Sequence, residues 1–267
     1  MTDTEHPHRL LGPTDPAPFR LFNPDQPRPL LLVCDHASRS TPTALDGLGL
    51  TEDDLCRHIA WDIGSAAVTE RLAQRFDATA LFAGYSRLFV DCNRAPGSST
   101  IFPQLSDGTV VPGNHGLSSQ DKAARLEQVF NPYHDAINKE LSCFARAGTV
   151  PAFLSIHSFT PVLDGVERPW EFGVLWDSDP RLALPLIRAL RGAGHKVGDN
   201  EPYSGRYPDD YTVDFHAEPA GLPHAGIEIR QDLLADEAGI DIWTGRLADA
   251  LETVLDDNSI YSVLKAS

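Results

Sequence analysis

Short apolar runs alternate along this chain with longer stretches that have apolar residues at helical spacing. The run Leu30–Cys34 is apolar without alternation, which is typical of a strand buried on both faces of a sheet. Similar runs predict strands at residues 78–82, 88–90, 152–156, 172–175 and 226–229. Amphipathic periodicity predicts helices over residues 51–72, 119–147, 180–191 and 240–255. This alternation predicts an α/β fold with a mostly parallel mixed sheet.

In two segments the hydrophobic residues recur with neither helical nor strand periodicity. Residues 1–28 contain many prolines, which deny the segment a regular helix, so we expect an irregular N-terminal arm. Residues 95–118 are rich in glycine, proline, serine and threonine, and a loop of this length in a compact domain is usually functional. We expect it to be an active-site loop. The whole chain, 1–267, is predicted to form one catalytic domain.

Charge and composition narrow the function. Thirty-eight acidic residues against 22 basic ones give a formal charge of −16, which disfavours nucleic acids and anionic membrane surfaces as partners. No secretory signal is visible, and no run approaches the roughly 20 apolar residues of a membrane span. The four cysteines form no C-x-x-C motif, so we expect a reduced, cytoplasmic protein. The oligomeric state is unknown from this sequence.

Polar clusters directly follow the predicted strands. His36 and His157 each end a buried strand, residues 91–94 follow another, and Glu228 lies in the last one. Ligands of parallel α/β sheets collect at the carboxyl ends of the strands, so these side chains are expected at one edge. Neutral imidazole is a common zinc ligand, and a catalytic zinc usually has three protein ligands. The two histidines are therefore candidates for two of the three zinc ligands.

An ordered set of short motifs resembles the N-formylglutamate amidohydrolases. The set spans about residues 30 to 158 and comprises Asp35-His36-Ala37-Ser38, Trp61-Asp62, Tyr85-Ser86-Arg87, Val90-Asp91-Cys92-Asn93-Arg94, Pro132-Tyr133-His134 and His157-Ser158. Three segments also resemble zinc carboxypeptidases. Segment 153–159 resembles the strand that carries their last zinc-binding histidine, and segment 227–230 resembles the strand that carries their catalytic glutamate. The Asn93-Arg94 pair resembles the pair that binds a substrate carboxylate. The resemblance implies a zinc-carboxypeptidase-like three-layer sandwich, amide hydrolysis and one zinc per chain.

The metal ligands depart from the carboxypeptidase pattern, in which the first two come from one H-x-x-E motif. His36 is followed by no glutamate at that spacing, so the remaining ligand must come from elsewhere. Asp62, on the predicted helix, is the leading candidate beside His36 and His157. Asp35 and His58 remain alternatives, since His58 lies one helical turn before Asp62.

The resemblance also implies the catalytic residues. Glu228 is predicted to take a proton from a zinc-activated water and pass it to the leaving nitrogen. Strand alternation also allows a structural alternative, a salt bridge from Glu228 to Arg230. Arg87 is predicted to contact a second substrate carboxylate or the oxyanion, or else to pair with Asp91 or another acid.

Substrate binding is predicted for four further residues. Arg94 has a planar fork that fits a carboxylate, and Asn93 adds a neutral donor. His115 in the long loop and His134 in the predicted helix over residues 119–147 are the other candidates. The expected substrate is N-formylglutamate or a similar N-acyl amino acid. The alternatives are a catalytically idle binding protein on the same fold and a small-peptide carboxypeptidase.

Overall fold

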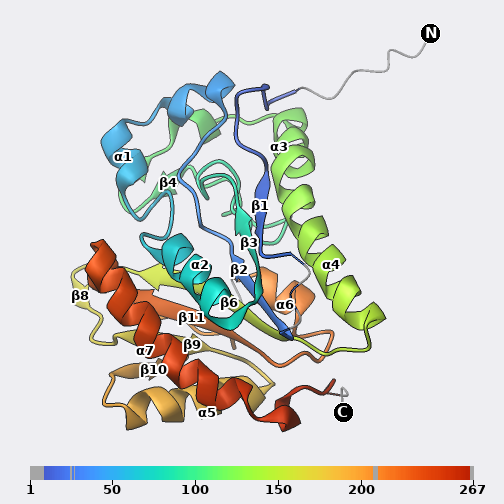
Figure 1. Cartoon of the computed structure of the whole chain (residues 1–267). Coiled ribbons are helices and arrows are strands. Elements are labelled where there is room, and N and C mark those ends of the chain that lie inside the picture. The colour runs from blue at the N-terminus through green and yellow to red at the C-terminus, as the bar shows by residue number, and fades with distance from the viewer. Residues whose placement is uncertain (1–8, 25, 27, 207–209, 265–267) are drawn as a thin grey trace.

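The computed structural model describes residues 9–24, 26, 28–206 and 210–264. A seven-stranded sheet in the order β1-β3-β2-β6-β11-β9-β10 forms its centre (Figure 1). The strands are β1 (Phe19–Phe22), β2 (Leu30–Cys34), β3 (Thr79–Ala83), β6 (Ala152–Phe159), β9 (Phe172–Leu175), β10 (Val197–Asp199) and β11 (His224–Arg230). Four neighbouring pairs are parallel, and only β1–β3 and β9–β11 are antiparallel. The predicted mostly parallel mixed sheet is confirmed.

Helices cover both faces of this sheet. They are α1 (Glu52–Cys56), α2 (Ser65–Phe76), α3 (Ser119–Arg125), α4 (Asn131–Arg146), α5 (Pro180–Gly192), α6 (Thr212–His216) and α7 (Glu237–Leu255). Leu30 and Leu32 pack with α2, α5 and α7 on one face, while Leu31 and Val33 pack with α4 and α6 on the other. Burial on both faces explains why β2 is apolar without alternation. The narrower likeness to zinc carboxypeptidases stays a prediction.

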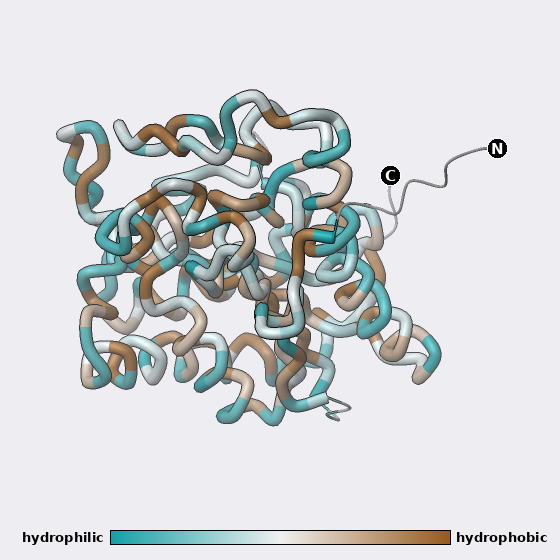
Figure 2. Tube along the Cα trace, turned by 90° about the horizontal axis from the view of Figure 1, so that it is seen from above, coloured by the Kyte–Doolittle hydropathy of each residue, from teal (hydrophilic) through white to brown (hydrophobic). Residues whose placement is uncertain are grey.

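The outer helices are amphipathic, and teal and brown stretches alternate along the tube in Figure 2. In the part of the chain that the structure describes, no helix combines the length and apolar character needed to cross a membrane.

The predicted irregular arm contains an edge strand. β1 pairs antiparallel with β3, and the Gly84 N–H donates to the Pro18 carbonyl 2.9 Å away. The prolines flank this strand instead of interrupting it, which is the position that a sheet edge tolerates. Residues 1–8, 25 and 27 of the predicted arm lie outside the described residues.

The predicted helix over residues 51–72 is two helices. α1 ends at Cys56 and α2 begins at Ser65, and the non-helical connection between them contains Asp62. Arg57 after α1 is extended, and Gly64, the N-cap of α2, adopts a left-handed backbone with φ of 83°. The Asp62 N–H donates to the His36 carbonyl at 2.9 Å, so the connection is tied to the end of β2. Asp62 is therefore placed by a loop and not by a helix.

Residues 87–89 form a turn and Val90 is irregular, so the predicted strand at residues 88–90 is wrong. Leu88, Phe89 and Val90 are fully buried in a second apolar cluster beside the sheet. The side chain of Asn114 donates to the Leu88 carbonyl at 2.8 Å, and that of the buried Arg125 donates to the Phe89 carbonyl at 2.8 Å. Side chains thus replace the missing strand partner, which a short apolar run cannot reveal.

The predicted helix over residues 119–147 is continuous in path but changes its winding. A π-helical turn, Leu126–Phe130, joins α3 to α4, and Pro132 follows it at the start of α4. Proline has no backbone N–H to donate, and the π-helical turn lies directly before it, where the hydrogen-bond pattern of the helix changes.

Two short hairpins lie outside the main sheet. The long segment 95–118 contains the hairpin of β4 (Leu105–Ser106) and β5 (Thr109–Val110), and β7 (Val162–Leu163) forms the second with β8 (Val166–Glu167).

Gly64→Ala is expected to lower the free energy of unfolding by about 3 kcal/mol, because the residue has a positive φ and no room. A Cβ at this position would lie 2.6 Å from the Leu234 Cβ. Gly148 is the matched control, since it has φ of 69° and no atom within 4 Å of its Cβ position. Gly148→Ala should cost only about 1 kcal/mol in the same urea titration of metal-free protein. Equal losses in the two variants would contradict this account.

Candidate metal centre

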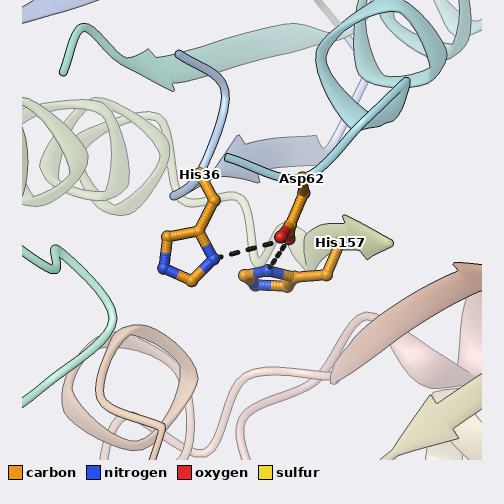
Figure 3. Close-up of side chains that lie close together, drawn as sticks. All are labelled: His36, Asp62 and His157. Carbon is orange, nitrogen blue, oxygen red and sulfur yellow. Dashed lines mark hydrogen bonds and ion pairs between the residues drawn. The ribbon is translucent and has the colours of Figure 1, made fainter. Parts of the chain in front are cut away.

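Three buried ligand atoms converge where β2 and β6 end. His36 is the second residue after β2, His157 lies on β6, and Asp62 reaches between them from the α1–α2 connection (Figure 3). Oδ2 of Asp62 lies 2.8 Å from Nδ1 of His157 and 3.4 Å from Nδ1 of His36. The ligand atoms of the three residues all lie within 4.8 Å of one another, so this group could hold a metal ion.

A carboxylate stands behind each imidazole. Nε2 of His36 lies 2.7 Å from Asp91 Oδ1, and Nε2 of His157 lies 3.2 Å from Asp35 Oδ2. Burial alone would raise the pKa of both aspartates, but their contacts with the histidines lower it well below the usual range. Nε2 of His36 donates a hydrogen bond to Asp91, and Nε2 of His157 donates one to the Ser155 hydroxyl at 2.8 Å, which in turn donates to Asp35. Nδ1 of each ring therefore faces Asp62.

This arrangement fits a divalent cation. Nδ1 of each histidine faces the same carboxylate oxygen, and Nδ1 of His36 is buried with no hydrogen-bond partner among the described residues. A cation between them satisfies all three, and a carboxylate behind a ligating histidine is the usual support of such a site. Without metal, burial and Arg87 lower the pKa of His36 to about 4, whereas Asp35 and Glu228 overcome burial and raise that of His157 to about 9. Metal binding would therefore release a proton.

A cavity of about 100 Å³ opens beside the three ligands. Its other lining residues are Arg87, Asn93, Arg94, Ser158, Tyr203, Asp210 and Glu228. Glu228 lies on β11 in register with His157, and its Oε2 is buried with no hydrogen-bond partner in the described chain. Burial raises the pKa of this carboxyl to about 7. Arg230 pairs with Asp232 at 2.7 Å, so the alternative salt bridge from Glu228 to Arg230 is wrong.

The predicted arginines line this cavity but already have acidic partners. Arg87 forms an ion pair with Oδ1 of Asp62, the oxygen that does not face the histidines. Arg94 donates to Asp210 at 2.9 Å. Asn93 accepts the backbone N–H groups of Tyr211 and Thr212, each at 2.9 Å, through its amide oxygen. The oxygen of Asn93 therefore fixes the start of α6.

Sequence comparison decides the family. Residues 28–235 match the model of the N-formylglutamate amidohydrolases. The chain belongs to the N-formylglutamate amidohydrolase family. It is 28% identical to an N-formylglutamate deformylase of Pseudomonas aeruginosa over 251 residues, which cover 85% of this chain and 90% of that protein. An N-formylglutamate deformylase of Pseudomonas putida is 24% identical and covers similar shares, 85% and 89%.

Two solved structures share the fold of this chain. A gene product of Agrobacterium tumefaciens superposes with a TM-score of 0.91 at 35% identity, and covers 94% of this chain and 100% of that one. The N-formylglutamate amidohydrolase of Ralstonia eutropha superposes with a TM-score of 0.68 at 20% identity, over 90% of this chain and 97% of that one, and shows a shared fold.

Two predicted substrate-binding residues of this N-formylglutamate amidohydrolase family member lie away from the cavity. Nδ1 of His134 lies 2.8 Å from His216, and its Nε2 lies 2.9 Å from the Cys92 carbonyl, so both nitrogens already have protein partners. His115 is exposed on the surface. Neither these two histidines nor the described segment 95–118 contributes to the lining of this cavity. Residues 105–108 instead border a neighbouring surface cavity that Arg87 also reaches.

The two alternative ligands lie elsewhere as well. His58 faces Asp107, with Nε2 3.5 Å from Oδ2, and not the metal centre. Asp35 supports His157 from behind and accepts hydrogen bonds from three hydroxyl groups, those of Tyr133 (2.9 Å), Ser155 (2.9 Å) and Thr212 (2.7 Å). Sequence reasoning missed this supporting function, and it missed Tyr203 and Asp210, which belong to no motif in the chain.

Glu228→Gln should change how the stability of the metal-free protein depends on pH. The folded chain keeps the Glu228 proton up to about pH 7. The unfolded chain loses it near its ordinary value of about 4.5, so this group lowers the free energy of unfolding as pH rises between these values. Relative to wild type, the variant should gain on the order of 2 kcal/mol between about pH 5 and pH 8. Urea titrations measure this gain, and the exposed Glu167→Gln is the control. An equal gain in both variants would disprove the assignment.

Proposed function

We propose that this protein is a zinc-dependent amide hydrolase that cleaves N-formylglutamate, or a similar N-acyl amino acid, into a carboxylic acid and an amino acid. The observation that carries the proposal is the His36–Asp62–His157 group, with a carboxylate behind each histidine and the buried Glu228 beside it. The family, and the deformylase names of its curated relatives, support the same chemistry. We further propose a single catalytic domain and a cytoplasmic location.

The donor set supports zinc as the metal. Two imidazole nitrogens and one carboxylate oxygen form a three-ligand set that leaves a coordination position open, as catalytic zinc sites do. When bound, zinc would polarise the acyl carbonyl and lower the pKa of a water molecule towards about 7. We expect one zinc per chain.

Glu228 is the proposed general base and acid. It takes a proton from the attacking water and passes it to the amide nitrogen, while a C–O bond forms and the C–N bond breaks. Its pKa of about 7 in the metal-free protein suits proton transfer in both directions. A nearby cation favours the charged carboxylate, so the base form prevails at neutral pH once metal is bound.

Of the two arginines that line the cavity, Arg94 is proposed to bind the substrate and Arg87 to position Asp62. The Arg94 side chain is 23% exposed and is oriented by Asp210, which suits it to bind the substrate α-carboxylate. Arg87 orients the Asp62 carboxylate from its far oxygen and adds positive charge near the site of carbonyl attack. Their charges offset those of Asp62 and Asp210 at the cavity, which lowers the barrier that a chain of charge −16 sets against an anion.

Metal content tests the ligand set. Wild-type protein supplied with zinc should contain about one zinc per chain, and His157→Ala should contain little, because two ligands bind far more weakly than three. His58→Ala is the matched control, since His58 lies outside the centre, and it should keep its zinc. Elemental analysis after gel filtration gives the ratio. Wild-type protein without zinc, or an equal loss in both variants, would refute the centre.

Activity tests the general base. Glu228→Gln should bind zinc normally and release formate from N-formylglutamate more slowly by roughly 10²- to 10⁴-fold in kcat, because the proton acceptor is gone. The exposed Glu167→Gln should match wild type. Formate is quantified with time at saturating substrate. If zinc-loaded wild type cleaved no N-acyl amino acid and no small peptide, the idle binding protein would be the better interpretation.

A further inference from the structure

Two hairpins outside the main sheet meet at a cavity that the proposed chemistry does not use. The turn of the β4–β5 hairpin is Asp107-Gly108 and that of the β7–β8 hairpin is Asp164-Gly165, and all four residues have positive φ. Aspartate followed by glycine is typical of such tight turns, which fix the register of the two strands. Both hairpins line one surface cavity of about 410 Å³, which we name the hairpin cavity.

The hairpin cavity and the catalytic cavity border one another at Arg87, which lines both. The Arg87 guanidinium pairs with Oδ1 of Asp62, whose other oxygen faces the two histidines of the metal centre. The hairpin cavity therefore lies next to the group that would hold the metal. A further cavity borders the catalytic one at Asn93, His157 and Asp210, and it shares no lining residue with the hairpin cavity.

The proposed pose of the substrate directs its acyl group towards the hairpin cavity. Arg94 binds the α-carboxylate in this pose, and Asp210, the partner of Arg94, lies at the border with the further cavity. The reacting carbonyl carbon has the amide nitrogen on one side and the acyl substituent on the other. Because the amino acid is held at Arg94, the substituent points to the border that Arg87 forms. A formyl group has only a hydrogen atom at this position and does not extend into the hairpin cavity.

The hairpin cavity has apolar walls, formed by Ile59, Leu105 and Leu163. Leu105 is 63% exposed, so most of its apolar surface is in contact with water. An alkyl group bound there would remove this surface and its own from water, which is favourable. A water molecule occupies about 30 Å³ in the liquid, so the cavity has room for several CH₂ groups of similar size.

The charges around the hairpin cavity favour a neutral group. Arg57 donates to Asp107 at 2.8 Å, and Arg87 pairs with Asp62, so these charges are compensated within the chain. Asp164 is exposed at the turn of the β7–β8 hairpin and has no ion-pair partner among the described residues. Its carboxylate would repel an acyl group that is itself negatively charged.

We propose that the hairpin cavity is an acyl subsite, which binds the alkyl part of the substrate acyl group. The enzyme then hydrolyses N-acyl amino acids with a short, neutral aliphatic acyl chain in addition to formyl. Water adds to the acyl carbon, the C–N bond breaks, and the products are an aliphatic carboxylic acid and the free amino acid. This inference rests on the proposed function and specifies the acyl class of its substrate.

The test compares N-acetylglutamate with N-butanoylglutamate, whose amide groups have similar intrinsic reactivity. Zinc-loaded wild type should hydrolyse both, with kcat/KM about tenfold higher for the butanoyl substrate, because two further CH₂ groups leave water. Leu163→Trp should fill the cavity and lower this ratio to about one. Leu105→Trp changes an exposed position of the other hairpin and should lower it as well. Released glutamate is quantified, and both substrates are measured on the same sample, so the ratio does not depend on the folded fraction.

Val162→Trp is the matched control. Val162 precedes Leu163 on β7 and points to the other face of the hairpin, because side chains alternate along a strand. It is 48% exposed and does not line the hairpin cavity. The same bulk is therefore added to the same hairpin outside the cavity, and this variant should keep the wild-type ratio.

Calorimetry on zinc-loaded Glu228→Gln separates binding from chemistry. N-butanoylglutamate should bind to this variant about tenfold more tightly than N-acetylglutamate. Equal affinities, cleavage of N-formylglutamate alone by wild type, or a wild-type ratio in both tryptophan variants of the cavity would overturn the inference and leave the proposed function standing. If zinc-loaded wild type released glutamate from none of the three substrates, the proposed function would be overturned, and the acyl specificity with it.

Discussion

The parallel pairing of β6 with β2 on one side and β11 on the other is the constraint on which the whole site depends. Val33 lies in register with Ser155, and Glu228 with His157, so His36, His157 and Glu228 emerge side by side at one edge of the sheet. Backbone hydrogen bonds set neighbouring strands about 4.8 Å apart, within the reach of one side chain. Apolar contacts on both faces keep these strands buried, so the functional groups stand on the most rigid part of the fold.

Charge balance decides what this edge can bind. Asp35, Asp62 and Asp91 are all buried around two imidazoles, and such a group is stable only if its negative charge is compensated. Hydroxyl groups compensate Asp35, and Arg87 compensates one oxygen of Asp62. The other oxygen of Asp62 faces the Nδ1 atoms of His36 and His157, and a cation bound between these three atoms would balance the remaining negative charge.

Secondary structure followed from the sequence wherever packing and local pattern agree. The runs at 30–34 and 152–156 became central strands because both faces of the sheet are covered. The pattern failed where tertiary contacts replaced local ones. Residues 88–90 are as apolar as a strand, yet the Arg125 and Asn114 side chains satisfy their carbonyls and no strand pairs with them. The helical spacing after residue 51 likewise conceals the non-helical connection between Cys56 and Ser65, in which the Asp62 N–H bonds to the His36 carbonyl.

The sequence by itself determined the family, the α/β class and three residues, His36, Asp62 and His157, that the structure brings together. Those residues belong to short local motifs, and a strand-end position already restricts where a side chain can go. Only the tertiary structure decided that Asp35 and Asp91 support the histidines, that His134 and His115 lie outside the cavity, and that Tyr203 lines it. Each of these outcomes depends on contacts between segments far apart in the chain, and no local pattern encodes such a distance.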